Sequence, residues 1–242
     1  ETDLLEVQEI RSIGYTTSGI ARQQIILTFS DSAKTEFLDA QVISNIGITP
    51  AGDVTENIIT RYAEIAEGVN TAGKIALGDL SGEIDRQKIT TQEFDAMGNA
   101  VEQTIVREYW GREKDENGNE IGEEKFLFSE TQRIRNYEYD LYSRAGRSVI
   151  LTYGDQAASA DEFLQMQDIS YLAYDEYGNA LEQTISTYVW DENKTFINLN
   201  DILGSPSESG YDSRIESASS ECEVVDFKRI TNTYTDKTAQ YR

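Results

Sequence analysis

The sequence of 242 residues contains no histidine, one cysteine and two prolines. Without histidine, these residues cannot form a Ser-His-Asp or Cys-His catalytic site, or a zinc, copper or iron site with imidazole ligands. The single cysteine, Cys222, excludes an internal disulfide and a site of four thiolates. The two prolines and 17 glycines are too few for a collagen-like or proline-rich chain.

Basic residues are also scarce, since 21 Lys and Arg accompany 44 Asp and Glu and give a net charge of −23. This excess argues against nucleic acids and anionic membranes as partners, because both bind basic surfaces. No apolar run approaches the ~18 residues that a membrane-spanning helix needs, so membrane insertion is not expected. Apolar residues make up 38% of the chain, which suffices for a core.

The two ends of the sequence look cut. The chain opens on Glu1 without an initiator Met or a leader-like apolar run, and it stops at Arg242 within a strand-like run. We therefore expect it to be a segment of something longer.

Two stretches of the sequence are near copies of one another. Residues 94–105 read FDAMGNAVEQTI and residues 174–185 read YDEYGNALEQTI, and each stretch is followed five residues later by a tryptophan. Asp-x-x-Gly-Asn between β-branched runs predicts a hairpin turn, because Asp caps the turn while Gly and Asn tolerate positive φ. We therefore expect Gly98 and Gly178 at turn positions with positive φ.

A longer repeat relates the two halves of the chain, which together hold six hairpin-like units. Its three offsets are 124, 126 and 141 residues, shown by the pairs Ile26 and Ile150, Ile59 and Ile185, and Asp85 and Asp226. The sequence thus predicts a duplicated block of three hairpins, residues 1–125 and 126–242, with the second block truncated at its end.

The spacers between hairpins are short and polar. In residues 159–167, Ser159 precedes acidic residues as a helix N-cap does, and residues 32–41 repeat the pattern, so both predict one or two helical turns. Residues 67–83, 111–124 and 204–220 are polar and contain glycine, which predicts exposed loops.

These patterns predict an all-β fold of repeated antiparallel β-hairpins with short helical turns in the spacers. One apolar face per hairpin cannot be buried by that hairpin alone, so neighbouring hairpins must stack or curl to cover it. A β-spiral or shell meets this need, and tandem β-sandwiches of three hairpins each are the alternative.

The Tyr/Phe-Asp-x-x-Gly-Asn motif at residues 94–99 and 174–179, with Tyr139-Asp140 as a partial match, resembles the YD repeat of Rhs and teneurin-like proteins. In that family, hairpin repeats coil into a β-sheet spiral or shell on large secreted or cell-surface proteins. The resemblance implies an extracellular structural array rather than an enzyme. The spacers are longer than those of the family, where repeats run nearly back to back.

One acidic segment has the alternating oxygen ligands of a calcium loop around a glycine. The candidate ligands are Asp115, Asn117, Asn119 and Glu120. A hard cation such as calcium takes six to eight oxygen ligands. The alternative is an acidic hairpin tip, because the helix-flanked ligand set is incomplete. Apart from calcium, no cofactor is expected, and no catalytic residue stands out among the many carboxylates.

The chain contains 14 Tyr, 8 Phe and 2 Trp, which raises the alternative of a sugar-binding platform. Many of them lie at repeat-equivalent positions, such as Tyr15 and Tyr139, which predicts a packing role in the core. We therefore expect a non-enzymatic scaffold, a shell, filament or adhesive stalk, located outside the cell or on its surface. Its expected partners are neighbouring repeat segments, copies of itself, a glycan or a surface protein. The rival hypothesis is a carbohydrate-binding module or glycan-acting enzyme that uses carboxylates and exposed aromatics.

Overall fold

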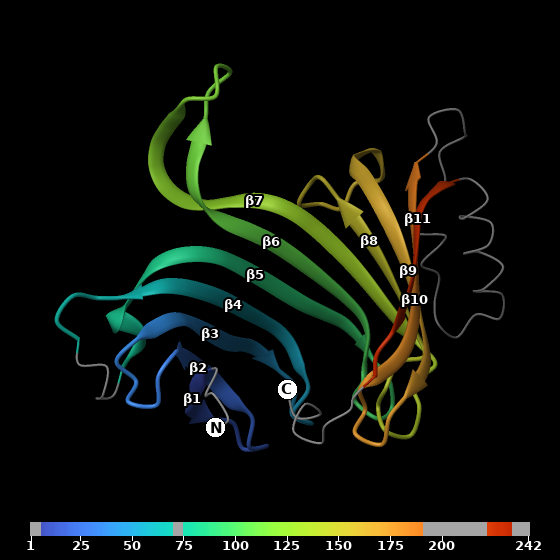
Figure 1. Ribbon diagram of the computed structural model, residues 1–242, viewed down its shortest axis with the longest axis horizontal. Coiled ribbons are helices and arrows are strands. Elements are labelled where there is room, and N and C mark those ends of the chain that lie inside the picture. The colour runs from blue at the N-terminus through green and yellow to red at the C-terminus, as the bar shows by residue number, and fades with distance from the viewer. Residues whose placement is uncertain (1–5, 70–74, 191–221, 234–242) are drawn as a thin grey trace. The chain divides into compact units, whose positions relative to one another are not determined.

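The computed structural model describes residues 6–69, 75–190 and 222–233, which form eleven strands and two short 3₁₀ helices (Figure 1). The strands lie in one antiparallel sheet in the order of the chain, β1 to β11, so each strand pairs with its sequence neighbours. This confirms the predicted all-β fold of consecutive hairpins. Tandem sandwiches would need two sheets per block, and the described residues form one sheet.

The elements are β1 (Val7–Tyr15), β2 (Ala21–Phe29), β3 (Phe37–Ile48), β4 (Val54–Ile65), η1 (Leu77–Asp79), β5 (Leu80–Phe94), β6 (Ala100–Lys114), β7 (Glu120–Tyr137), β8 (Arg147–Tyr153), η2 (Ala160–Glu162), β9 (Phe163–Tyr174), β10 (Ala180–Trp190) and β11 (Cys222–Thr231).

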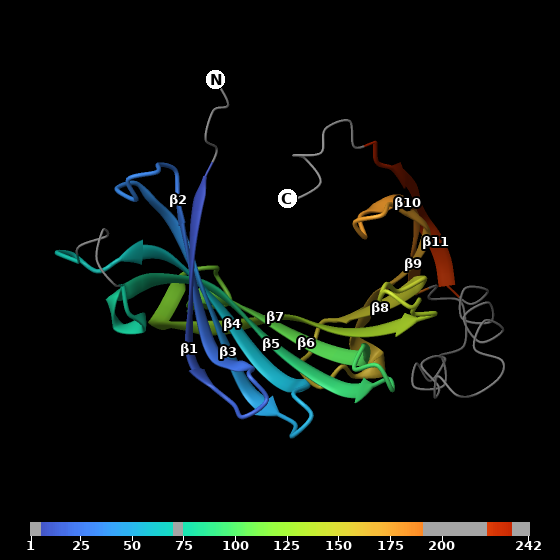
Figure 2. The same cartoon turned by 90° about the horizontal axis from the view of Figure 1, so that it is seen from below.

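The chain divides into two compact units. Unit 1 consists of Glu1–Thr91 and Ile105–Ser129, and unit 2 consists of Gln92–Thr104 and Glu130–Arg242. Strands β5, β6 and β7 therefore contribute residues to both units. The β1–β4 ribbons of unit 1 and the β8–β11 ribbons of unit 2 can be followed in Figures 1 and 2. The division of the sequence repeat at residues 125 and 126 stays a prediction.

The strand register of unit 1 recurs in unit 2. Equivalent pairs are Ile10–Ile26 and Ile134–Ile150, Ile43–Ile59 and Ile169–Ile185, and Ile59–Gln87 and Ile185–Lys228. These partners are related by the offsets of 124, 126 and 141 residues that the sequence shows. Because a slip of one residue turns every side chain to the opposite face, equal registers give equivalent side chains the same facing.

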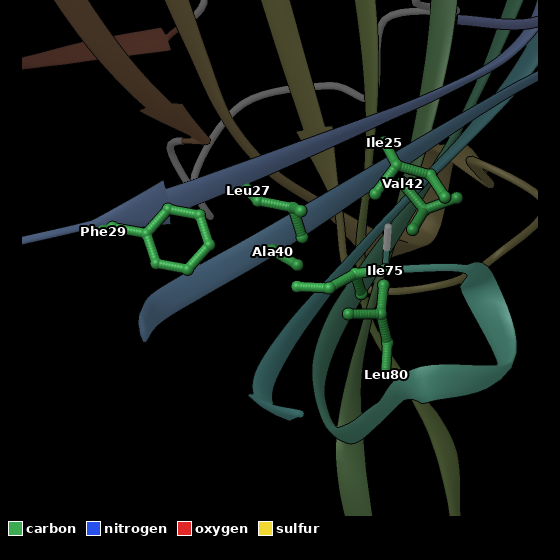
Figure 3. Close-up of a cluster of buried hydrophobic side chains, with 7 residues drawn as sticks. All are labelled: Ile25, Leu27, Phe29, Ala40, Val42, Ile75 and Leu80. Carbon is green, nitrogen blue, oxygen red and sulfur yellow. The ribbon is translucent and has the colours of Figure 1, made fainter. Parts of the chain in front are cut away.

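The core of unit 1 forms on one face of β2 and β3 (Figure 3). Ile25, Leu27 and Phe29 alternate along β2 and are inaccessible to solvent, since every second side chain of a strand points the same way. Ile75, from the connection between β4 and β5, and Leu80, the first residue of β5, belong to the same cluster. The prediction of an exposed loop at residues 67–83 is therefore wrong at these two residues, because their apolar side chains cover the face that the sheet leaves open.

Four buried positions of the unit 1 core recur in the core of unit 2. Its buried residues Val149, Leu151, Tyr153 and Met166 correspond to Ile25, Leu27, Phe29 and Ala40 of unit 1. In unit 1, the rings of Phe29 and Phe37 meet edge to face with a centroid distance of 6.0 Å. Their counterparts Tyr153 and Phe163 meet in the same way at the same distance. At these positions, equivalent residues perform the same packing in both units.

The two polar spacers differ from each other. The helical turn predicted in residues 159–167 is confirmed by η2, and Ser159 donates its N–H and hydroxyl to the Asp155 carboxylate at 2.8 and 2.5 Å. The helical turn predicted in residues 32–41 is wrong. There the Asp31 carboxylate accepts the backbone N–H groups of Thr35 and Glu36, which closes a non-helical turn directly before β3.

Residues 111–124 are mostly strand rather than the predicted loop, because β6 continues to Lys114 and β7 begins at Glu120. Ion pairs across this hairpin join Glu113 to Lys125 at 2.7 Å and Arg112 to Glu124 at 3.7 Å. Opposite charges on facing strands favour pairing, so the charged composition that suggested a loop here supports a two-stranded ribbon. The third predicted loop, residues 204–220, lies outside the described residues.

Candidate functional site

Six hairpin turns in the described residues share one hydrogen-bond pattern. In each, the N–H of the first residue donates to the carbonyl of the fifth, and the N–H of the fourth donates to the carbonyl of the first. The fourth residue has positive φ, as predicted for Gly98 (83°) and Gly178 (88°). The turns cover residues 16–20, 49–53, 95–99, 115–119, 140–144 and 175–179.

The first residue of four of these turns is an aspartate that caps the turn. In the 95–99 turn, one Asp95 carboxylate oxygen accepts the N–H groups of Met97 and Asn99, each at 2.8 Å. The other oxygen accepts the Asn99 side-chain amide at 2.8 Å. These hydrogen bonds, led by that of the Asn99 side chain, hold the pKa of Asp95 below its ordinary value. The cap therefore keeps its charge in mildly acidic solution.

The candidate calcium ligands fall on another copy of this turn, between β6 and β7. Asp115 accepts the N–H groups of Asn117 and Asn119 at 2.9 Å each, and its second oxygen accepts the Asn119 side chain at 3.1 Å. Glu120 is exposed at the start of β7. Because both Asp115 oxygens bond within the turn, capping explains the alternating spacing, and the geometry favours the acidic hairpin tip over the calcium loop. Calcium binding stays a prediction.

In unit 2, an arginine joins two neighbouring turns. Arg144, the fifth residue of the 140–144 turn, donates its Nε to Asp140 at 2.7 Å and Nη1 to the carbonyl of Asp175 in the 175–179 turn at 3.2 Å. Its guanidinium lies 4.9 Å from the centroid of the Tyr142 ring and 4.8 Å from that of Tyr174. Cation–π contacts of this kind fix aromatic rings in place. Sequence reasoning missed this role, because it depends on turns that are distant in the chain.

The third residues of the unit 2 turns present large side chains to solvent. Tyr142 is 79% exposed, Met97 is 60% exposed, and Leu141, the second residue of its turn, is 87% exposed. Tyr177 occupies the third position of the 175–179 turn and is also exposed. The 95–99 turn lies beside the 140–144 turn, since the Tyr139 hydroxyl donates to the carbonyl of Ala100 at 2.7 Å.

Tyr15 and Tyr139, predicted to share a core position, differ in exposure. Tyr139 is partly buried by the contact with Ala100, whereas Tyr15 is exposed. The prediction of a core role is therefore wrong for Tyr15. Strand β7, which precedes Tyr139, has β6 as a neighbour, whereas β1 is an outer strand of the described sheet. The pair shows that an equivalent position shares its packing only where the neighbouring strand is also present.

Glu108 of β6 is the only buried acidic residue in the described part of the chain. It bonds to Arg86 at 2.6 Å and to Lys88 at 3.2 Å, and the Arg86 guanidinium also lies 4.0 Å from the centroid of the Phe126 ring. Burial raises the pKa of Glu108, but the hydrogen bonds and charges of Arg86 and Lys88 outweigh it and lower the pKa overall. A general acid in glycoside hydrolysis needs the opposite shift.

No family model, curated protein or solved structure matches the chain in the comparisons with known proteins. Among residues 6–69, 75–190 and 222–233, no helix has the length and apolarity needed to span a bilayer. The same residues contain no group of three or more Cys, Asp or Glu side chains placed to hold a metal ion.

Proposed function

We propose that this chain is a non-enzymatic scaffold segment of a large secreted or cell-surface protein, a hairpin-repeat array of the kind that the YD-repeat resemblance implies. The observation that carries the proposal is the recurrence of register and core between the two units. A fold that reuses the same hairpins and the same packing can be lengthened without a new kind of core, as in other repeat proteins.

The turns and the surface charge also support a scaffold. Six connections use one compact turn, which gives the array short, hydrogen-bonded ends. The net charge of −23 keeps a long array soluble and makes unwanted pairing between the sheet edges of separate molecules less favourable. In this proposal the stacked hairpins supply length and surface, and the exposed turns supply contacts with partners.

The rival function, glycan binding or glycan cleavage, has less support. The buried carboxylate Glu108 is held ionised by two cations, which leaves it without the proton that a general acid transfers. Exposed tyrosines such as Tyr142 offer ring faces that a sugar can stack on, so the experiment must include glycans.

Single-molecule pulling from the two ends tests the scaffold proposal. An array of hairpins should resist force and lengthen in steps of about 100 Å, the extended length of roughly 30 residues, as hairpins detach one after another. Unfolding without resistance would contradict the array. In parallel, the chain is incubated with a panel of polysaccharides, and release of new sugar ends from any of them would contradict the non-enzymatic assignment.

A further inference from the structure

The exposed turns of the two units have the same backbone but different tips. At the sequence offsets of 124 and 126, Leu141, Tyr142 and Tyr177 of unit 2 correspond to Thr17, Ser18 and Ala51 of unit 1. All of these residues lie in turns with the same hydrogen bonds. Small or polar residues are therefore sufficient to form this turn, and the large side chains of unit 2 need another explanation.

Packing within the unit does not supply that explanation. The side chains of Leu141 and Tyr142 are 87% and 79% exposed. At the core positions, by contrast, Val149, Leu151 and Tyr153 keep the apolar or aromatic character of Ile25, Leu27 and Phe29. Exposed apolar side chains have a cost in solubility, and where several lie on neighbouring turns, as here, they mark an interaction site in many proteins. The turn tips thus differ in chemical character between the units, whereas these core positions do not.

Hydrogen bonds hold the backbone of these tips in fixed positions. The backbone N–H groups of Met97, Tyr142 and Tyr177 each donate to the capping aspartate of their own turn, at 2.8 to 2.9 Å. Arg144 adds its contacts with the Tyr142 ring and the neighbouring turn, and its counterpart in unit 1 is Ile20, which has no charge. Preorganised side chains lose less conformational entropy on binding, which favours affinity.

We propose that the tip row of unit 2, defined as Met97, Leu141, Tyr142 and Tyr177, binds a protein segment that carries apolar anchor side chains flanked by Lys or Arg. Tyr, Met and Arg are enriched at protein interfaces, and this row combines the first two with the adjacent Arg144. The apolar anchors of the partner would pack on Leu141 and Met97, and its flanking cations would face the acidic residues of the turns.

The charge of the turns determines the sign of the charge expected on the partner. The three turns, residues 95–99, 140–144 and 175–179, contain four carboxylates and one arginine, for a local charge of −3. The carboxylates are Asp95, Asp140, Asp175 and Glu176. A second copy of this chain, with its net charge of −23, would be repelled from this surface, whereas a cationic segment would be attracted.

A glycan fits the row less well than a protein. Sugar recognition needs polar groups beside the rings, but Asp95, Asp140 and Asp175 all accept hydrogen bonds within their own turns. Leu141 and Met97 provide neither a ring face nor a hydrogen bond for a sugar hydroxyl. Leu141 and Met97 therefore suit a protein partner with apolar side chains better than a glycan.

The test uses a phage-displayed library of random peptides selected on the chain and counter-selected on a Leu141→Thr/Tyr142→Ser variant. This variant introduces the residues of the equivalent turn in unit 1, which already form the same backbone. The expected peptides are rich in Lys and Arg around Trp, Phe or Leu. As synthetic peptides in calorimetric titrations, they should bind the variant about tenfold or more weakly than the parent chain, and bind the parent less tightly at high salt.

Two further variants distinguish this proposal from non-specific hydrophobic binding. Tyr177→Ala, again the residue of the equivalent unit 1 turn, should weaken the same peptides on its own. In the background of the double variant, Thr17→Leu/Ser18→Tyr restores the overall composition but places the apolar tips on unit 1. If that chain recovers binding, exposed apolar side chains in any turn suffice and the proposal is overturned.

Other outcomes also contradict the proposal. These are a failure to select peptides that depend on the row, selection of acidic peptides, and binding of arrayed glycans that is lost in the double variant. Self-association of the parent chain that the double variant abolishes would make a second copy the occupant and would likewise overturn it. Circular dichroism and the thermal midpoint of each variant verify that the turn still folds.

Discussion

Asp168 of β9 occupies the position that Val42 occupies in β3. In unit 1, Val42 pairs in register with Ile25 and joins the buried cluster. In unit 2, Asp168 pairs in register with Val149, and its carboxylate accepts two hydrogen bonds from Arg147, at 2.8 and 2.5 Å. The same backbone position therefore supports an apolar contact in one unit and an ion pair in the other.

This relationship predicts the effect of exchanging the ion pair for the residues of unit 1. Asp168→Val alone should destabilise the chain by about 1–3 kcal/mol, because Arg147 is largely buried and loses this carboxylate. Adding Arg147→Gln, the residue at the equivalent position 23, should recover most of the loss. Urea unfolding of the two single variants and the double variant measures the coupling. A double variant as unstable as Asp168→Val would contradict the equivalence of the two positions.

A second prediction concerns the fourth position of the turns. Ser143 occupies it with φ 62°, where other turns have glycine, so Ser143→Gly should stabilise the chain by about 0.5–1 kcal/mol through relief of strain. Gly118→Ala should cost about 1 kcal/mol, because φ there is +83° and no atom lies within 4 Å of the added methyl group.

Gly78→Ala is the matched control for the turn variants. The methyl group would again meet nothing within 4 Å, but the backbone of Gly78 is outside the left-handed region. Its thermal midpoint should stay level or rise slightly. If Gly78→Ala and Gly118→Ala lowered the thermal midpoint equally, the positive φ of Gly118 would not be the cause of its loss of stability.

A third prediction is that stability falls in acid as the turn caps become protonated. Hydrogen bonds hold the pKa values of Asp95, Asp115 and Asp140 below their ordinary value, led in each case by the side chain of the fifth turn residue, Asn99, Asn119 or Arg144. Because the folded pKa is lower than the unfolded one, this stability is present above about pH 4 and is lost as the pH falls through the folded values.

The measurement compares thermal midpoints of the chain and of Asp115→Asn between about pH 6 and about pH 2.5. Asparagine retains an oxygen that can accept the two backbone N–H groups but does not titrate in this range. The variant should therefore lose less stability between the two conditions than the parent. If the parent chain and Asp115→Asn lost the same stability between the two pH values, the Asp115 cap would not contribute to the acid sensitivity of the fold.

A fourth prediction distinguishes calcium binding from general screening of charge. Sodium chloride and calcium chloride at matched ionic strength should raise the thermal midpoint equally, because both reduce the repulsion that comes from the charge of −23. A larger effect of calcium that disappears in Asp115→Asn would establish the calcium loop at Asp115, Asn117, Asn119 and Glu120 instead.

The hairpin turns were the most predictable part of the fold and of its surface. Their signal is local, because an aspartate, a glycine and an asparagine within five residues close their own hydrogen bonds. The 140–144 turn was harder to recognise, since Ser143 and Arg144 replace the glycine and asparagine while the backbone stays the same. The recurrence of the strand register in both units agrees with the offsets of the sequence repeat, because a slip of one residue would turn the apolar face to solvent.

Contacts between distant residues could not be predicted in this way. The burial of Ile75 depends on the β4–β5 connection folding back over β2 and β3. The residues next to Ile75 in the sequence carry no signal that the connection folds back. The ion pairs of Glu108 depend on the alignment of β5 with β6, and the contact of Arg144 with Asp175 depends on two turns lying side by side. The contrast between Tyr15 and Tyr139 likewise required knowledge of which strands are neighbours.

The all-β class, the consecutive hairpins, the offsets that relate the two halves and the glycines of the turns can all be inferred from the amino-acid sequence. Each of these follows from residues that are close in the chain or from comparison of one segment with another. Three features emerge only from the three-dimensional packing: which equivalent positions are buried, how Asp168 is paired with Arg147 where unit 1 has a buried valine, and which apolar side chains on the turn tips remain exposed. Burial and pairing are set by whatever packs across a residue, and in this sheet that neighbour lies tens of residues away in the chain.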